Sequence, residues 1–315
     1  MLKFVIKRLL SAIPVLIIVL VLVFFLMRIM PGDLAHNLAG EEATEEQIEA
    51  MKKQLGLDKP ITVQFVEYFT GVLKGNLGNS LYNKKSVVKN IRDRMEPTLL
   101  LMVYSTLLSV LIGIPFGILA ARNRNKPLDY AVTSVSIFAL AVPNFWLGLM
   151  MVYYIGVVLK WFPVQGYTAI AKGSLWKSLY YLTMPALTSA SGHIASITRY
   201  TRSTMLDILN NDYIKTARAK GLSENKVYYL HALKNSLAPV VTMVGFSMAG
   251  MLGGSSVIEQ TFNIPGMGRL ALDSLTRRVY TQEQAIILFV AAIFVFTNIL
   301  LDITYKLLDP RIEFD

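Results

Sequence analysis

Cysteine is absent from the 315-residue sequence, and histidine and charged residues are scarce. Without cysteine the chain can form no disulfide, thiol nucleophile or cysteine-based zinc site. The three histidines, His36, His193 and His231, are scattered and do not suggest a metal site. Charged residues make up 17%, against about 25% in a soluble globular domain. The deficit lies in long uncharged runs, which predicts a membrane protein and excludes a soluble enzyme.

The short motifs that accompany catalysis are also missing. No Walker A, H-E-x-x-H or G-x-S-x-G sequence occurs. Gly266-Met267-Gly268-Arg269-Leu270-Ala271 matches the dinucleotide pattern G-x-G-x-x-G/A, but no strand is expected before it and no βαβ unit around it. We interpret this stretch as a Pro265-Gly266 turn. The chain is therefore expected to be non-catalytic and to bind no cofactor, so any ATP that it uses is hydrolysed by another chain.

Six apolar runs are long enough, or nearly so, to cross about 30 Å of hydrocarbon as helices. They are Leu9–Met27, Thr98–Ala121, Tyr130–Leu159, Ser178–Thr198, Ser236–Ile258 and Gln284–Leu301. The fourth is only moderately apolar, which is typical of a helix shielded from lipid by its neighbours. The first follows three basic residues and resembles a signal peptide, but it is too long and lacks a small-residue cleavage pattern. The sequence predicts an all-α, polytopic membrane protein that keeps its first helix.

Lysine and arginine in the short connections predict the orientation. Basic residues are concentrated in the N-terminal tail, in the loop after the second run and in the loop after the fourth. With six crossings these segments and the C-terminus lie on one side, which is the cytoplasm. The opposite side holds 31–97, 160–177 and 259–283. Membrane orientation therefore explains the net charge of +10 better than a nucleic-acid partner does.

The outer segment 31–97 contains helical signals. Thr44-Glu45-Glu46-Gln47 fits a capping box, and apolar residues then recur at helical spacing until Gly56. A second amphipathic stretch covers about Val63 to Leu73, and a third, Ser86–Met95, leads into the next membrane helix. The segment is either a small helical cap or a docking surface for an outside partner, and the sequence leaves both readings open.

Polar side chains inside the apolar runs are candidates for a transport path. Asn144 and His193 either line a water-filled route or satisfy a neighbouring helix. Asp302 and Arg199 lie near the predicted cytoplasmic boundary, where they pair with each other or reach toward water.

Glycine and proline mark possible close contacts and breaks in the helices. Gly113-x-x-x-Gly117 and Gly250-x-x-x-Gly254 allow two helices to approach, either within the chain or with a second membrane subunit. Pro143 and Pro185 are expected to interrupt two helices and to open backbone carbonyls to a cavity.

The cytoplasmic stretch 199–239 predicts a helix, a turn and a second helix. Asn211 or Asp212 is suited to cap the first helix, and Gly221 to stop it. A second helix over Glu224–Lys234 returns to the membrane. Such a platform is a natural docking piece for a cytoplasmic protein. The residues that share one face or are small enough for a close approach are Tyr213, Ala217, Ala219 and Gly221.

Several motifs along nearly the whole chain together resemble the peptide/nickel branch of binding-protein-dependent ABC importer permeases. Asp212-Tyr213-Ile214-Lys215-Thr216-Ala217-Arg218-Ala219-Lys220-Gly221 is similar to the family's cytoplasmic coupling motif. The other matching stretches are Met30-Pro31-Gly32-Asp33, Leu55-Gly56-Leu57-Asp58-Lys59-Pro60, Glu259-Gln260-Thr261-Phe262-Asn263-Ile264-Pro265-Gly266-Met267-Gly268-Arg269-Leu270 and Leu308-Asp309-Pro310-Arg311. In detail the sequence resembles the first, B-type permease of dipeptide, oligopeptide and glutathione systems.

The resemblance implies a type I importer permease fold in a bacterial inner membrane, with both termini cytoplasmic. It implies a homologous second permease, two cytoplasmic ATP-binding subunits and an extracytoplasmic substrate-binding protein as partners, besides membrane lipid. By carry-over, Asp212, Tyr213, Ala217, Ala219 and Gly221 contact the ATPase, whereas Asn144 and His193 are our own candidates for the path. ATP binding and hydrolysis would drive alternating access.

The implied organisation has four parts. They are an N-terminal transmembrane helix at 1–30, an extracytoplasmic helical segment at 31–97, a permease core with five transmembrane helices at 98–308, and a cytoplasmic tail at 309–315. The coupling helix lies in the core, over residues 209–222.

The sequence departs from the general importer pattern in three places. Lys215-Thr216-Ala217 stands where the motif opens with Glu-Ala-Ala, so no acid at that slot can form a salt bridge. The gap from Gly221 to Pro239 is long, as in the peptide branch. The connection 160–177 is short for an oligopeptide-type subunit, which favours a dipeptide or glutathione system.

Other functions remain as alternatives. A nickel or metal-chelate importer of the same family would show clustered histidines in its path, and only His193 lies in a predicted span. A secondary transporter would need central carboxylates or an ion site, and none lies centrally. An intramembrane enzyme would need a paired nucleophile and base or metal ligands, which the sequence does not show.

Overall fold

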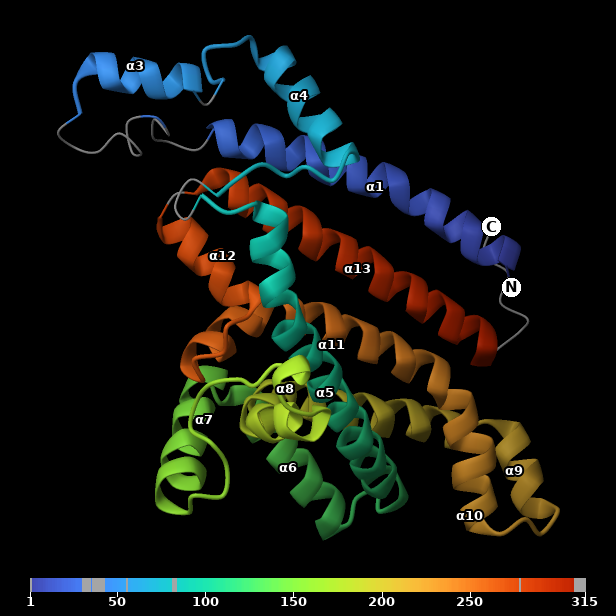
Figure 1. Ribbon diagram of the computed structural model, residues 1–315. Coiled ribbons are helices and arrows are strands. Elements are labelled where there is room, and N and C mark those ends of the chain that lie inside the picture. The colour runs from blue at the N-terminus through green and yellow to red at the C-terminus, as the bar shows by residue number, and fades with distance from the viewer. Residues whose placement is uncertain are drawn as a thin grey trace. The chain divides into compact units, whose positions relative to one another are not determined.

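The computed structural model describes residues 2–29, 35, 43–54, 56–80, 84–277 and 279–308, and their regular structure is helical (Figure 1). In these ranges the only β-type pairing is one isolated bridge between Asn79 and Ser86. The predicted all-α class is therefore confirmed. The Met30–Asp33 motif, Leu55 and the tail from 309 to 315 lie outside the described residues.

The chain forms two compact units. The first contains Met1–Met95 and Arg269–Val295, and the second contains Glu96–Gly268 and Phe296–Asp315. Helices α1 (Leu2–Ile29), α3 (Glu45–Gln54), α4 (Ile61–Leu73) and most of α12 (Met267–Thr276) belong to the first unit. Helices α5 (Val87–Arg122) and α13 (Tyr280–Leu308) contribute to both.

Helices α3 and α4 form where the sequence signals predict them. The backbone N–H of Thr44 donates to Gln47 Oε1 at 3.0 Å, and the N–H of Gln47 donates to Thr44 Oγ1 at 3.4 Å. This reciprocal pair confirms the capping box. At the other end the N–H of Gly56 donates to the carbonyl of Lys53 at 3.1 Å, so the helix stops at the predicted glycine.

Helix α4 packs on α1 through aromatic side chains. The rings of Phe24 and Phe65 lie 5.1 Å apart, and Phe24 is fully buried. Arg28 lies over the Phe24 ring and donates through Nε to Gln64 Oε1 at 3.0 Å. Part of the outer segment is therefore attached to the first membrane helix.

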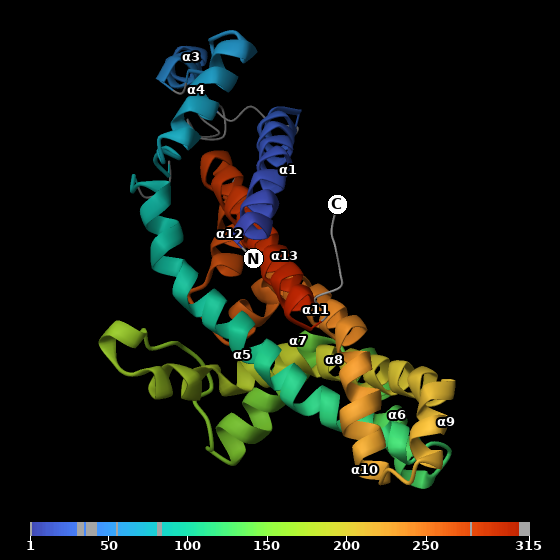
Figure 2. The same ribbon diagram turned by 90° about the vertical axis from the view of Figure 1, so that its right-hand side faces the viewer.

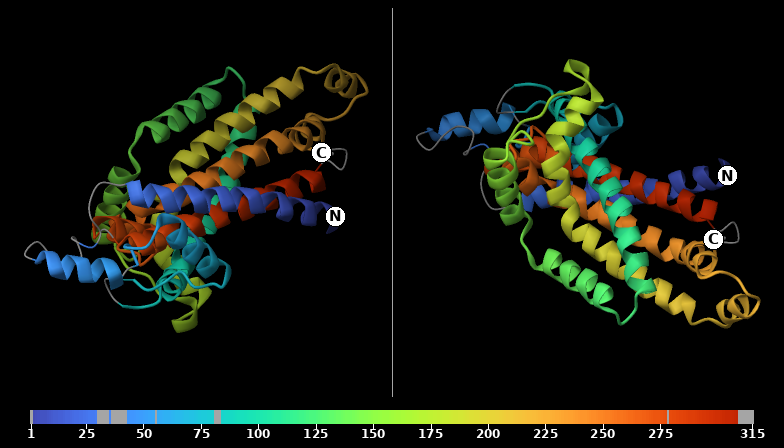
Figure 3. Two further views of the ribbon diagram at one scale, coloured as in Figure 1. Left: turned by 90° about the horizontal axis from the view of Figure 1, so that it is seen from above. Right: turned by 90° about the horizontal axis from the view of Figure 1, so that it is seen from below.

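The second unit is built around one long helix, α8 (Leu175–Leu209). Helices α6 (Pro127–Ala141), α7 (Asn144–Met151) and α11 (Lys234–Thr261) pack against it. Figure 2 shows the second unit from the side, and Figure 3 shows α6, α8 and α11 side by side. The shorter elements are η1 (Val152–Val158), η2 (Ile170–Lys172), α9 (Asp212–Ala219), α10 (Glu224–Lys226) and η3 (Val227–Leu233).

Among the described residues, four helices are long and apolar enough to span a membrane, and a bent pair would give a fifth span. The four contain the predicted runs one, two, five and six, and the bent pair contains run three. Run four lies in α8, which is 35 residues long but less apolar than the four helices above. Its serines and threonines are largely buried within the second unit, as expected for a helix that neighbours shield. The sixth crossing, through α8, therefore stays a prediction.

Proline has opposite effects at the two predicted breaks. The run Tyr130–Leu159 is not one helix, because it bends by 100° between Ala141 and Asn144, with Pro143 as the N-cap of α7. The prediction for Pro185 is wrong, since α8 continues through it. A proline costs an interior helix one hydrogen bond, and packing on several sides can hold the helix together despite that loss.

The predicted glycine pairs also behave differently. A Cβ on Gly113 would lie 2.9 Å from Ile197, and one on Gly117 would lie 2.6 Å from Thr201, so this pair packs α5 against α8 within the chain. On α11, Gly250 faces His193, whereas a Cβ on Gly254 would meet no described atom within 4 Å. The first motif therefore serves internal packing.

A short loop on the predicted outer side is attached to α5. Glu96 Oε1 accepts hydrogen bonds from the Tyr167 hydroxyl at 2.5 Å and from the Ile170 N–H at 2.8 Å. Burial and this carboxylate raise the pKa of the Tyr167 hydroxyl above its usual range. These two bonds hold the part of the connection 160–177 around Tyr167 and Ile170 against α5.

Candidate functional site

Helix α9, the turn after it, α10 and η3 form a hairpin at one end of the second unit (Figure 1). We call residues 211–233 the coupling hairpin. Ile214 on α9 is fully buried and packs with residues of α8 and η3. The buried side chains of this cluster are Ile118, Ala121, Met205, Leu209, Ile214, Val227 and Ala232. One apolar side chain of α9 thus seats the hairpin, and most of the helix stays exposed.

The turn of the coupling hairpin is a glycine-terminated helix stop. The N–H of Leu222 donates to the carbonyl of Ala217 at 3.3 Å, and that of Gly221 to Arg218 at 2.9 Å. These two bonds make a Schellman motif, with Gly221 at φ +78°. Among the described residues nothing lies within 4 Å of a Cβ built on Gly221, so the backbone conformation, and not space inside the chain, requires glycine. The predicted stop is confirmed.

The five residues predicted to meet an ATPase lie together on this hairpin. Asp212, Ala219 and Gly221 are exposed, Tyr213 is 44% exposed, and Ala217 is partly buried. Asn235 on α11 donates through Nδ2 to the Tyr213 hydroxyl at 3.1 Å, which orients that ring. The surface offered to a partner is therefore small side chains beside one positioned tyrosine.

The N-terminal cap of α9 differs from expectation in one respect. Asn211 occupies the cap position, but its side chain makes no capping hydrogen bond. Asp212 instead accepts from Lys215 Nζ at 2.9 Å. Both side chains of this pair are largely exposed, so the N-terminus of α9 is open to an external group.

An ion pair closes the coupling hairpin. Arg218 donates through Nε and Nη2 to the two carboxylate oxygens of Glu224, at 2.9 and 3.2 Å. This hydrogen bonding raises the pKa of the Arg218 guanidinium above its usual value. The pair connects α9 to α10 across the turn, six residues apart in the chain.

The two candidates for a transport path lie on different helices. Asn144 is the exposed first residue of α7, and His193 is a partly buried residue of α8. A Cβ on Gly250 of α11 would lie 3.5 Å from His193 Cε1. No hydrogen bond joins Asn144 to His193, both of which the structure describes, so the two are not brought together as one site.

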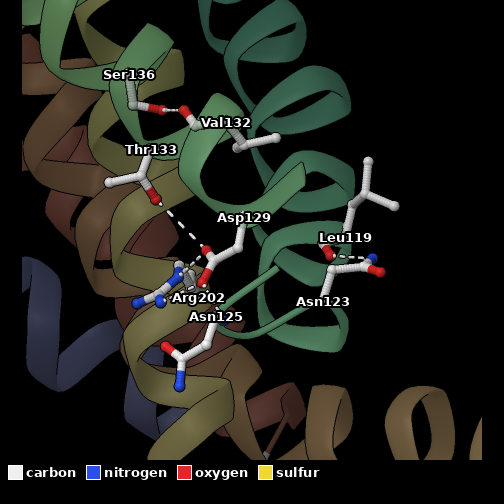
Figure 4. A network of polar contacts seen from close by, with 8 residues as sticks. All are labelled: Leu119, Asn123, Asn125, Asp129, Val132, Thr133, Ser136 and Arg202. Carbon is white, nitrogen blue, oxygen red and sulfur yellow. Dashed lines mark hydrogen bonds and ion pairs between the residues drawn. The ribbon is translucent and has the colours of Figure 1, made fainter. Parts of the chain in front are cut away.

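A buried ion pair that sequence reasoning missed joins α6 to α8 (Figure 4). Arg202 donates through Nε to Asp129 Oδ1 at 2.6 Å and through Nη2 to Oδ2 at 2.7 Å. The N–H of Asn125 adds a third bond to Asp129 at 3.0 Å, and Thr133 lies 3.5 Å from Oδ1. The signal that could have found Asp129 is an acid in the first turn of a helix, directly after a basic loop.

The ion pair that the sequence suggested between Arg199 and Asp302 does not form. Helix α8 extends to Leu209, so Arg199 and Arg202 are helical and not part of a loop. Arg199 makes no ion pair with Asp302 or any other residue in the part of the chain that the structure describes.

Comparisons with known proteins match the whole chain. The family model "Binding-protein-dependent transport system inner membrane component" matches residues 113–314, and a model for the N-terminal part of such membrane components matches 1–102. A probable peptide ABC transporter permease protein, y4tP, of Sinorhizobium fredii is 39% identical over 99% of each chain. The oligopeptide transport system permease protein AppB of Bacillus subtilis is 39% identical, and the glutathione transport system permease protein GsiC of Salmonella choleraesuis is 40% identical, each over 100% of both chains.

The fold also matches a solved transporter. An inward-facing conformation of the MetNI methionine ABC transporter aligns with a TM-score of 0.56 at 15% identity, covering 69% of this chain and 95% of the other. At this identity the likeness concerns the fold alone.

Proposed function

The chain belongs to the binding-protein-dependent transport system inner membrane components, and we propose that it is one permease subunit of an ATP-driven importer of short peptides. It is a multi-pass membrane protein with the type I importer permease fold. In the proposal it lies in a bacterial inner membrane, with both termini cytoplasmic. The cited relatives are named for peptide, oligopeptide and glutathione transport, which supports peptides as the substrate class.

The observation that carries the proposal is the shape of the coupling hairpin. The buried side chains Ile214, Val227 and Ala232 and the Arg218–Glu224 pair fix the hairpin. Ala219 and Gly221 are exposed, and no long side chain covers the backbone at these two positions. A surface of this kind can enter a groove in another protein. We propose that two cytoplasmic ATPase subunits bind here and on a homologous second permease, and that hydrolysis occurs in those subunits.

The transport path is proposed to run between α8 and α11. His193 lies beside Gly250 there, and the glycine leaves the imidazole room. Asn144 is proposed to contribute from the exposed start of α7, where the chain bends after Pro143. Substrate would be delivered from the outer side by a binding protein, and alternating access would expose this route to each side in turn.

A nickel importer of the same family is less well supported. Among the described residues no three of His, Cys, Asp or Glu lie close enough together to hold a metal ion. The peptide proposal needs no such cluster. Organisation into the segments 1–30, 31–97, 98–308 and 309–315 stays part of the proposal.

Substitution of Gly221 tests the docking surface. Gly221→Asp places a negative charge on the turn, and Gly221→Asn adds the same bulk without the charge; both residue types tolerate positive φ better than other non-glycine residues. Both variants should insert in the membrane normally, and the Asp variant should lose more co-purifying ATPase than the Asn variant. Wild-type ATPase stoichiometry and transport in Gly221→Asp would contradict the docking assignment.

Transport by the purified chain tests the function as a whole. The chain reconstituted alone should move no peptide, and the complex with ATPase subunits should move peptide only with ATP. Peptide uptake by the chain alone without ATP would instead identify a secondary transporter.

A further inference from the structure

A cavity of about 470 Å³ lies between α6, α8 and α11, separate from the coupling hairpin. Its lining residues are Thr133, Leu140, Ser196, Arg199, Tyr200, Arg202, Ser203 and Met243. Two guanidinium groups and four hydroxyls thus share one space with two apolar side chains. Among the described residues, no carboxylate lines the cavity.

The two arginines differ in their hydrogen-bond partners. Arg202 is held by Asp129 through Nε and Nη2, so its Nη1 donors keep a fixed direction and remain for another acceptor. Asp129 balances this charge from the side of α6. Arg199 forms no hydrogen bond or ion pair among the described residues and is exposed. The cavity therefore carries uncompensated positive charge.

The cavity has a polar end and an apolar wall. On α8, Arg199, Arg202 and Ser203 follow the predicted end of the membrane run at Thr198, so they lie at the level of lipid headgroups on the proposed cytoplasmic side. Leu140 and Met243 supply the apolar wall. An amphiphilic anion with a charged head and hydrocarbon chains matches this order.

Helix α6 presents an apolar outer surface beside the cavity. It packs mainly on α8, and its remaining surface is apolar and open, with Val135 and Phe138 each 67% exposed. A basic cavity between membrane helices on the cytoplasmic side is the usual setting for acidic lipid headgroups. A peptide in transit has an ammonium group as well as a carboxylate, and the residues lining this cavity offer no acid for it.

We propose that the cavity between α6, α8 and α11 binds the phosphate headgroup of an anionic phospholipid from the cytoplasmic leaflet. Arg199 and Arg202 contact the phosphate, and the hydroxyls of Tyr200 and Ser203 donate to it, since those of Ser196 and Thr133 already donate within the chain. Leu140 and Met243 contact the upper part of the acyl chains. The proposal rests on the orientation proposed above. Because the proposed path also runs between α8 and α11, the test of the lipid site includes displacement by a peptide.

Native mass spectrometry of the purified transporter complex tests the site. The complex is delipidated and titrated with phosphatidylglycerol or, separately, with phosphatidylcholine. Wild type should bind one phosphatidylglycerol tightly. Arg199→Gln should weaken that site about fivefold, since one basic side chain near a lipid surface contributes about 1 kcal/mol. Arg199→Lys should retain most of the affinity, which separates lost charge from misfolding.

Arg124→Gln is the matched control, because it removes the same charge from an exposed position in the α5–α6 loop that does not line the cavity. It should bind phosphatidylglycerol as wild type does. Equal affinity in wild type and Arg199→Gln, or equal binding of phosphatidylcholine, overturns the proposal. Displacement of the lipid by millimolar inorganic phosphate assigns the site to a free anion, and displacement by a tripeptide assigns it to the transport path; either result also overturns it.

Discussion

Two arginine–carboxylate pairs use the same fork geometry in different surroundings. Arg218–Glu224 closes the coupling hairpin, and its side chains are 39% and 53% exposed. Arg202–Asp129 joins α8 to α6, and its side chains are 28% and 2% exposed. The first pair connects residues six apart in the chain, and the second connects residues 73 apart.

The difference in burial decides what each pair does. Water and salt screen an exposed pair, so it contributes little to stability. A buried carboxylate has lost its hydration, so removal of either partner leaves an uncompensated charge or unpaired donors. The α6–α8 pair therefore helps to hold these two helices together. The hairpin pair adds only a little stability to a turn whose conformation Gly221 and Ile214 already determine.

The largest expected effect comes from Asp129→Ala. This substitution leaves the partly buried Arg202 guanidinium without its partner and should lower the free energy of unfolding by about 3 kcal/mol. Chemical unfolding of the chain in detergent measures the loss. The double variant Asp129→Leu/Arg202→Met should recover much of it, because no buried charge then remains. If the free energy of unfolding of Asp129→Ala lay within about 0.5 kcal/mol of the wild-type value, a structural role for the pair would be refuted.

An intermediate effect comes from Gly117→Ala. Gly117 lies where α5 packs closely against α8, the helix that also carries Arg202. The new Cβ would lie 2.6 Å from Thr201 Cβ and 2.8 Å from the Thr198 carbonyl, and this overpacking should cost about 1–2 kcal/mol. Gly254→Ala on α11 is the matched control. It meets no described atom within 4 Å, and because alanine favours helix it should raise stability by up to about 1 kcal/mol. Changes of the same sign in both variants would show that local packing does not distinguish the two glycines.

The smallest expected effect comes from Glu224→Gln. It removes the charge of the exposed hairpin pair and should change the free energy of unfolding by about 0.5 kcal/mol or less. The difference from wild type should also shrink at high salt, because the pair is screened. The same unfolding experiment at low and high ionic strength measures both. A loss as large as that of Asp129→Ala would remove the contrast between the two pairs.

Local features could be predicted from the sequence because neighbouring residues determine them. Thr44 and Gln47 form the capping box within one turn, and Gly221 ends α9 through bonds to residues at most five positions away. The apolar runs likewise mark their own helices, since a helix satisfies its backbone internally. For the same reason, all five residues that were predicted to contact an ATPase lie on one hairpin.

Features that depend on distant residues could not be predicted. The role of Asp129 is not visible in the sequence, because its partner Arg202 lies 73 positions away. Pro143 and Pro185 carry the same intrinsic penalty, yet only the first stands at a break, since α8 is buried on several sides and α6 and α7 are not. The moderate apolarity of run four was visible in the sequence, but the helices that shield it were not.

Helices α10, η3 and α11 follow one another without interruption over the 38 residues Glu224–Thr261. This stretch is not straight, because the π-helical η3 and Pro239 lie within it, and helices bend at such positions. Figure 1 shows α10 and α11 running in different directions. Arg218 of α9 is bonded to Glu224 at the start of this stretch, and Gly250 lies more than halfway along it, beside His193. The turn of the coupling hairpin and the surroundings of His193 are thus joined by one unbroken helix, so any movement of one end has to be taken up along the same backbone.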